Sequence, residues 1–101
     1  MKKYVSELIG TFALVFCGTG AMTVSEITGG TDLTHTGIAI TWGLIVMAMI
    51  YAFGEISGAH FNPAVTIAFA FAKKFSWKEV PKYIIAQLIG AILASCILWV
   101  L

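Results

Sequence analysis

Three apolar runs, each close to 20 residues long, dominate this sequence of 101 residues. They cover about 4–25, 37–54 and 83–101, and the second and third contain no charged side chain. A helix needs ~20 predominantly apolar residues to cross the hydrocarbon core of a bilayer. Only 11% of the residues are charged, whereas soluble domains carry ~25%. The chain is therefore predicted to be an all-α membrane protein with three transmembrane helices. The first run is longer than the short apolar core of a signal peptide and contains Glu7 near its beginning, so it is expected to be an uncleaved span.

A fourth apolar segment, Ala64–Ala72, is too short to cross. As a helix it covers about 14 Å, roughly half of the hydrocarbon core. The lysines lie in two groups, before the first run and after this segment: Lys2, Lys3, Lys73, Lys74, Lys78 and Lys82. They share one face of the membrane only if the short segment enters and returns. The positive-inside rule therefore predicts a re-entrant loop and half-helix over about 56–72 and a cytoplasmic N-terminus.

The sequence predicts how this re-entrant segment begins. Asn62 is a favoured N-cap residue and Pro63 suits the first helical position, so the half-helix should run from Pro63 to about Ala72. Irregular backbone is tolerated at membrane depth where it is buried in protein or lines a water-filled cavity. Four residues would present backbone carbonyls there: Gly58, Ala59, His60 and Phe61. Such acceptors, the Asn62 amide donors and a positive helix end suit neutral hydrogen-bonding solutes and repel cations. The Asn-Pro pair alone also fits a turn that caps a cytoplasmic amphipathic helix.

The stretch Ser57–Thr66, SGAHFNPAVT, resembles the first Asn-Pro-Ala signature of the aquaporin, or major intrinsic protein, family, with Asn62, Pro63 and Ala64 as the triplet. Glu7–Phe12 resembles the first-span Glu-x-x-x-Thr pattern of that family. Pro81–Gly90 resembles the start of its third span. The resemblance implies that residues 1–101 are the N-terminal half of an inverted-repeat channel. Each repeat of such a channel contributes three spans, a half-helix and one midplane Asn.

The resemblance also implies roles for individual residues. Glu7 would be a buried carboxylate that braces re-entrant backbone N–H groups, although a snorkelling residue near the interface is the alternative. Thr11 and Gln87 are expected to be buried polar groups. Trp42 would contribute to the outer constriction, where glycerol facilitators and nodulin-like members often carry Trp; alternatively it belongs to an interfacial aromatic belt. Glu55 departs from the pattern, because many members carry His there.

Two small-residue spacings and two cysteines are predicted to serve packing. Gly54-x-x-x-Gly58 and Gly90-x-x-x-Ala94 permit close helix approach, by resemblance against the other half or against neighbouring subunits. Cys17 and Cys96 lie within apolar runs and are expected to be small apolar packing residues.

The predicted function is passive conduction of water or small neutral solutes such as glycerol, in the plasma or inner membrane. By resemblance the partners are the lipid bilayer, a complementary C-terminal half or another copy, and a homo-oligomer, in the family a tetramer. The chain lacks the second Asn-Pro-Ala and the filter Arg of the family. It could therefore be a fragment of a longer protein, a split protein with a separate partner, or one copy of an antiparallel dimer. The dimer is disfavoured because one of its copies would carry all its lysines to the opposite face of the membrane. A non-conducting assembly subunit and a small proton-coupled exporter that uses Glu7 are the alternatives.

The sequence favours neither enzyme chemistry nor a cofactor. It shows no nucleophile–base pair, and Glu55 with His60 gives too few ligands for a structural zinc site. It contains no Arg, and its lysines lie in two groups that are far apart in the sequence, which argues against binding to nucleic acid.

Overall fold

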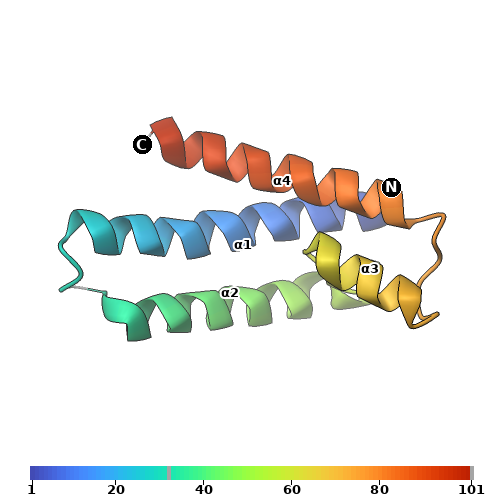
Figure 1. The fold of residues 1–101 in the computed structure, drawn as a ribbon, viewed down its shortest axis with the longest axis horizontal. Helices are drawn as coiled ribbons and strands as arrows, with labels where there is room; N and C mark the ends of the chain where they lie inside the picture. Colours follow the sequence, from blue (N-terminus) through green and yellow to red (C-terminus); the bar gives the residue numbers. More distant parts are fainter. Residues whose placement is uncertain (32, 101) are drawn as a thin grey trace.

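The computed structural model describes residues 1–31 and 33–100, which form four helices (Figure 1). These are α1 (Lys2–Ile27), α2 (Thr34–Ser57), α3 (Pro63–Phe71) and α4 (Val80–Val100). Within the described residues there is no β-strand. The three longer helices are each long and apolar enough to cross a membrane. The prediction of an all-α membrane protein with three such helices and one short one is therefore confirmed.

The helices extend past the apolar runs from which they were predicted. α1 is two residues longer at each end, α2 is three residues longer at each end, and α4 begins three residues earlier, at Val80. Backbone hydrogen bonding continues through the polar residues that flank an apolar run, whereas the predicted helix bounds followed the apolar residues alone. Leu101, the predicted end of the third span, lies outside the described residues, as does Asp32, which the lysine distribution predicts to lie with Glu26 in the outer loop before the second span.

α1 lies in the middle of the bundle, with α2 along one side and α4 along the other (Figure 1). α1 and α4 run in the same direction, and α2 returns between them in sequence. The short helix α3 packs against α4 near the end where the chain begins. The N-terminus and the start of α4 therefore share one end of the molecule, and the C-terminus lies toward the other.

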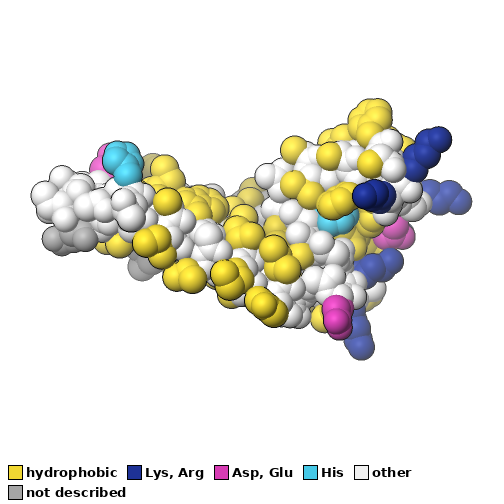
Figure 2. Space-filling model, turned by 90° about the horizontal axis from the view of Figure 1, so that it is seen from below, with side chains coloured by type: hydrophobic (Ala, Val, Ile, Leu, Met, Phe, Trp, Pro, Cys, Tyr) yellow, Lys and Arg dark blue, Asp and Glu magenta, His cyan; other side chains and the backbone are white. Residues whose placement is uncertain are grey.

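The lysine side chains gather at one end of the molecule. Figure 2 shows them in dark blue around the end that carries the N-terminus, the end of α3 and the start of α4. The opposite end, at the turn between α1 and α2, shows no lysine in this view. We call this shared end the Lys-rich end. The lysines are expected to gather at one end if the segment 56–72 enters the membrane and returns to the same side.

Small residues set the spacing between the helices. A Cβ atom on Gly90 of α4 would lie 2.4 Å from the backbone oxygen of Leu8, so α4 crosses α1 backbone against backbone. Ala94, one turn further on, is fully buried. The prediction that Gly90 and Ala94 face another half or subunit is therefore wrong, because α1 of the same chain already packs against this face of α4. Gly54 borders no helix crossing in the described chain, since the nearest side-chain atom to an added Cβ is Ile50 Cγ2 of its own helix at 3.7 Å.

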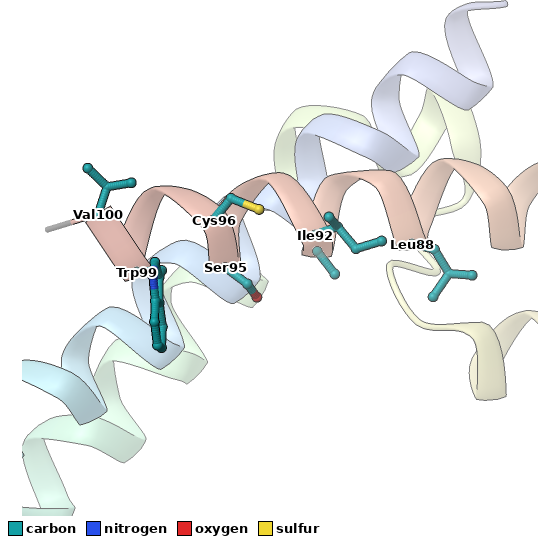
Figure 3. A pocket seen from close by; sticks show the side chains of 7 residues that line it. Leu88, Ile92, Ser95, Cys96, Trp99 and Val100 are labelled. Atoms are coloured by element: carbon teal, nitrogen blue, oxygen red, sulfur yellow. The ribbon is translucent and has the colours of Figure 1, made fainter.

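Large apolar surfaces remain uncovered. Ser57 is the only buried residue of α2, and one side of α4 carries apolar side chains that no other helix covers (Figure 3). This side includes Leu88, Ile92, Cys96 and Trp99, the last of which is 90% exposed. In water such surfaces would be strongly unfavourable. They fit a chain whose outer faces contact lipid or further protein.

Candidate pore-lining site

The half-helix α3 begins with a side-chain cap. Asn62 has an extended backbone, and its Oδ1 accepts a hydrogen bond of 2.8 Å from the backbone N–H of Ala64. Pro63 occupies the first turn, where its missing N–H costs nothing. α3 starts well inside the length of its neighbours and runs out toward the Lys-rich end (Figure 1). The exposed Asn62 amide therefore stands at the inner, positive end of a short helix.

The loop that leads to Asn62 has a strained backbone. Gly58, Ala59 and Phe61 all have positive φ angles, of 87°, 55° and 53°. A left-handed conformation costs a non-glycine residue ~1–2 kcal/mol. Among the described residues, none donates a backbone hydrogen bond to the carbonyl oxygens of residues 58–61. These four carbonyls, which precede the Asn62 amide in the chain, therefore receive no hydrogen bond from the described backbone.

Glu7 holds this loop from α1. Its side chain is fully buried. Oε1 accepts from the backbone N–H of Phe61 at 3.0 Å, and Oε2 accepts from the backbone N–H of His60 at 3.2 Å. The Ser57 hydroxyl donates to Oε2 at 2.7 Å, and Gln87 Nε2 donates to Oε1 at 2.6 Å. Four donors thus converge on one carboxylate, and two of them belong to the strained turn.

Gln87 and Tyr83 connect α4 to the same loop. The second hydrogen of Gln87 Nε2 is donated to Thr66 Oγ1 at 2.9 Å, and that hydroxyl lies 3.0 Å from His60 Nδ1. The Tyr83 hydroxyl donates to the backbone oxygen of Ser57 at 2.7 Å. Gln87, Tyr83 and Thr66 are each at most 1% exposed. The loop is therefore fixed from α1 and α4 together.

Phe61 contributes its backbone to the site and its side chain to the core. The ring is 5% exposed. An added Cβ on Gly10 would lie 2.0 Å from Phe61 Cε1, so the ring occupies the space that this glycine leaves on α1. The Phe61 ring thus anchors the loop on the same helix that supplies Glu7.

Two predicted residues lie apart from this network. Thr11 is buried, but its hydroxyl has no hydrogen-bond partner among the described residues, and neither has Gln87 Oε1. Trp42 lies in the first half of α2, with its ring over Gly18 of α1, where an added Cβ would be 2.3 Å from the indole. About 22 Å of helix separates Trp42 from the end of α2 at Ser57. Trp42 therefore lies well away, along α2, from the start of the loop that leads to Asn62.

Sequence reasoning did not single out Ser57, Thr66, Tyr83 or Gly10. Tyr83 is one helical turn before Gln87, so it shares that face of α4, and this spacing could have indicated its contact with the loop. Gly10 carries no such signal, because only the folded loop shows which ring fills its position. Glu55 is exposed in the last turn of α2. Among the described residues, no three His, Cys, Asp or Glu side chains are close enough to hold a metal ion.

Known proteins are similar to this chain in sequence. A probable NIP-type aquaporin of Nicotiana alata is 56% identical over 95 residues, which are 94% of this chain and 34% of that protein. Aquaporin NIP1-1 of Oryza sativa subsp. japonica is 52% identical over 95 residues, which are 33% of its length. The chain thus spans about a third of the length of the curated relatives that it matches.

The fold agrees with a solved structure, that of the aquaglyceroporin from Plasmodium falciparum. The TM-score is 0.83 at 36% identity, and the match covers 97% of this chain and 40% of that one. The sequence profile described as Major intrinsic protein matches residues 1–101. With the capped half-helix and the loop described above, these matches show that the chain belongs to the major intrinsic protein family.

Proposed function

We propose that this chain forms the N-terminal half of a passive membrane channel for water or small neutral solutes such as glycerol. The observation that carries the proposal is the inner end of α3. There the Asn62 amide, with its oxygen committed to Ala64 N–H, stands beside the four unengaged carbonyls of residues 58–61. A neutral solute can donate to the carbonyls and accept from the amide, whereas a cation meets the positive end of the helix.

A second half is required to enclose the pore. α2 has a single buried residue, and α3 contacts only α4 among the other helices. The Asn62 site is therefore open on the side that α1 and α4 do not cover. A second repeat of the same family, with its own half-helix, is the partner that we propose for this side, and a tetramer of such channels is the assembly that the family suggests.

The proposed orientation places the Lys-rich end in the cytoplasm. The six lysines belong to the start of α1, the segment that follows α3 and the start of α4, and Figure 2 shows lysine side chains around this end. Moving them across a membrane is unfavourable, so the positive-inside rule supports one fixed orientation in the plasma or inner membrane. That orientation also argues against two antiparallel copies as the source of the second half.

Stopped-flow light scattering tests the proposal. The chain is reconstituted in vesicles alone, and also fused to the remaining C-terminal part of the Nicotiana alata relative. Vesicles with the fusion should swell or shrink faster than empty vesicles under a water or glycerol gradient. Vesicles with the chain alone should match empty ones. The complete relative serves as the positive control for reconstitution.

Three outcomes would count against the proposal or against one part of it. A folded, membrane-inserted fusion that passes neither water nor glycerol would remove the channel function. A flux that rises with an imposed proton gradient would instead indicate coupled transport. Fast flux through the chain alone would contradict the need for a second half and favour assembly from two copies.

A further inference from the structure

α1 and α4 form an apolar groove next to the Lys-rich end. Its volume is about 310 Å³. The lining residues share one face of each helix, because they recur at helical spacings of three or four positions: Tyr4, Val5 and Leu8 of α1, and Lys82, Ile85 and Ile89 of α4. Val5, Ile85 and Ile89 are each more than 40% exposed. Met1 and Ala86 complete the lining, so the groove presents uncovered apolar side chains with Lys82 among them.

The groove has a closed end and a charged end. It lies between the backbone crossing of Gly90 with Leu8 and the start of α4. Because α1 and α4 run in the same direction, both walls lead from the Lys-rich end toward the membrane interior. Lys82 and Ile89 are seven residues apart, about 10 Å along a helix. This length suits the upper part of one lipid acyl chain.

The groove faces away from the candidate pore. Ile85 and Ile89 are two positions before and after Gln87, so they lie nearly opposite it around the axis of α4. Gln87 faces the loop that carries Asn62, through its bonds with Glu7 and Thr66. A partner that completed the pore on the Asn62 side would therefore leave the groove open to lipid.

Lys82 is the cation at the mouth of the groove. It is exposed, and its Nζ lies 5.7 Å from the centre of the Tyr4 ring. Among the described residues the one ion pair joins Lys3 and Glu79, at 3.9 Å, so Lys82 has no carboxylate in direct contact. Glu79 is held by Lys3 and by the Tyr4 hydroxyl. The ammonium of Lys82 thus has no direct ion pair, although its charge acts on the Glu79 carboxylate, and it lies open to an anion from the membrane surface.

We propose that this groove binds one acyl chain of an anionic phospholipid, with the lipid phosphate on Lys82. The excess of lysine over carboxylate at this end provides the charge complementarity, and the apolar walls provide the contact for the chain. Basic pockets between transmembrane helices are suited to anionic head groups. The proposal requires the chain to lie in a bilayer but does not depend on conduction.

Native mass spectrometry of the purified chain in detergent tests this site. Phosphatidylglycerol and phosphatidylcholine with the same acyl chains are compared as ligands. The chain should retain phosphatidylglycerol preferentially. A lysine near an anionic head group contributes about a fivefold change in affinity, so Lys82→Gln should lower phosphatidylglycerol retention about fivefold. Lys74→Gln, which removes the same charge at the same end but outside the groove, should leave retention nearly unchanged.

A second pair of variants tests the walls. Val5→Phe fills the groove and should reduce retention of both lipids, whereas Leu88→Phe, on a different exposed face of α4, should not. Glycerol phosphate, which has the charge without the chain, should not compete. Equal retention of the two lipids, equal effects of Lys82→Gln and Lys74→Gln, or competition by glycerol phosphate would each overturn the proposal.

Labelling of the parent chain makes the test independent of variant folding. Phosphatidylglycerol with a photoactivatable acyl chain should label peptides that contain Val5–Leu8 and Ile85–Ile89. Labelling spread evenly over α2 and the outer half of α4 would show a general lipid coat and would also overturn the proposal.

Discussion

Glu7 shows how one side chain can determine the shape of a loop. A carboxylate offers about four acceptor positions, and Glu7 receives hydrogen bonds from four donors while its side chain is fully buried. Two of the donors are backbone N–H groups within the turn that contains the positive φ angles of Ala59 and Phe61. These bonds offset the backbone strain.

Replacement of Glu7 by Ala should therefore destabilise the fold strongly. It would remove the carboxylate that accepts from four donors, of which the Phe61 N–H is buried and has no other acceptor, and each buried unsatisfied group costs ~1–3 kcal/mol. Because the loop can relax, we expect a net loss of roughly 3–5 kcal/mol in the free energy of unfolding in detergent. Glu55→Ala removes the same charge from an exposed site and should change stability by less than about 0.5 kcal/mol. Similar unfolding curves for the two variants would contradict the bracing role of Glu7.

Asn62 allows the electrostatic role of the site to be separated from its structural role. Asp caps a helix as well as Asn does, so Asn62→Asp should keep the cap on Ala64 and the folded state. The new negative charge at the inner end of α3 should reduce cation exclusion in the fusion channel proposed above. Na⁺ or H⁺ conductance across planar bilayers is the measurement. A conductance equal to that of the parent, in a stable variant, would remove Asn62 from cation exclusion.

At the Lys-rich end, the Tyr4 hydroxyl donates to Glu79 and lowers the pKa of that carboxyl below its ordinary value of 4.5, with Lys3 and Lys82 adding to the effect. A lowered pKa in the folded state stabilises the fold above the ordinary value, and this contribution is lost as the pH falls through the lowered pKa. Thermal unfolding followed from about pH 6 to about pH 3 should therefore show a steeper acid loss for the parent than for Tyr4→Phe. Tyr51→Phe, on the exposed face of α2, should behave like the parent; an acid loss equal in all three proteins would contradict the assigned bond.

The elements differ in how well the sequence predicted them. The spans and the half-helix were predictable because apolar length, the Asn-Pro cap and the lysine distribution are local signals. The Glu7 contact was expected only by resemblance, and the links from Tyr83 and Thr66 depend on how α4 crosses α1. The direction of the Gly90 face was predicted wrongly because a small-xxx-small spacing shows that a close neighbour exists without showing which helix it is.

That crossing provides a test of how α1 and α4 are spaced. Gly90→Ala would place a Cβ 2.4 Å from the backbone oxygen of Leu8, and backbone cannot move aside locally as a side chain can. We expect a loss of about 1–3 kcal/mol in the free energy of unfolding. Gly43→Ala, in α2 with no atom within 4 Å of the new Cβ, should instead stabilise by up to ~1 kcal/mol. The same sign of change in both variants would contradict the close crossing.

For the whole molecule, the lysine distribution makes a prediction about sidedness. The end that carries Lys2 and Lys74 should face the cytoplasm, and the turn that carries Thr31 should face outward. Single cysteines at these three positions, in a chain with Cys17 and Cys96 replaced by Ala, can be treated in intact cells with a membrane-impermeant maleimide. Thr31→Cys should react, whereas Lys2→Cys and Lys74→Cys should react only after the membrane is opened.

The pattern of labelling separates the remaining arrangements of the chain. If segment 63–71 crossed the membrane, Lys2→Cys and Lys74→Cys would differ in reactivity, which would contradict the re-entrant path. If copies inserted in both orientations, all three cysteines would react in intact cells in similar proportion, and two antiparallel copies could then supply both halves of a pore. Reaction at Thr31→Cys alone leaves one orientation, in which a pore requires a second, inverted repeat from another polypeptide segment. In that case the open side of the Asn62 site is the surface that this segment must cover.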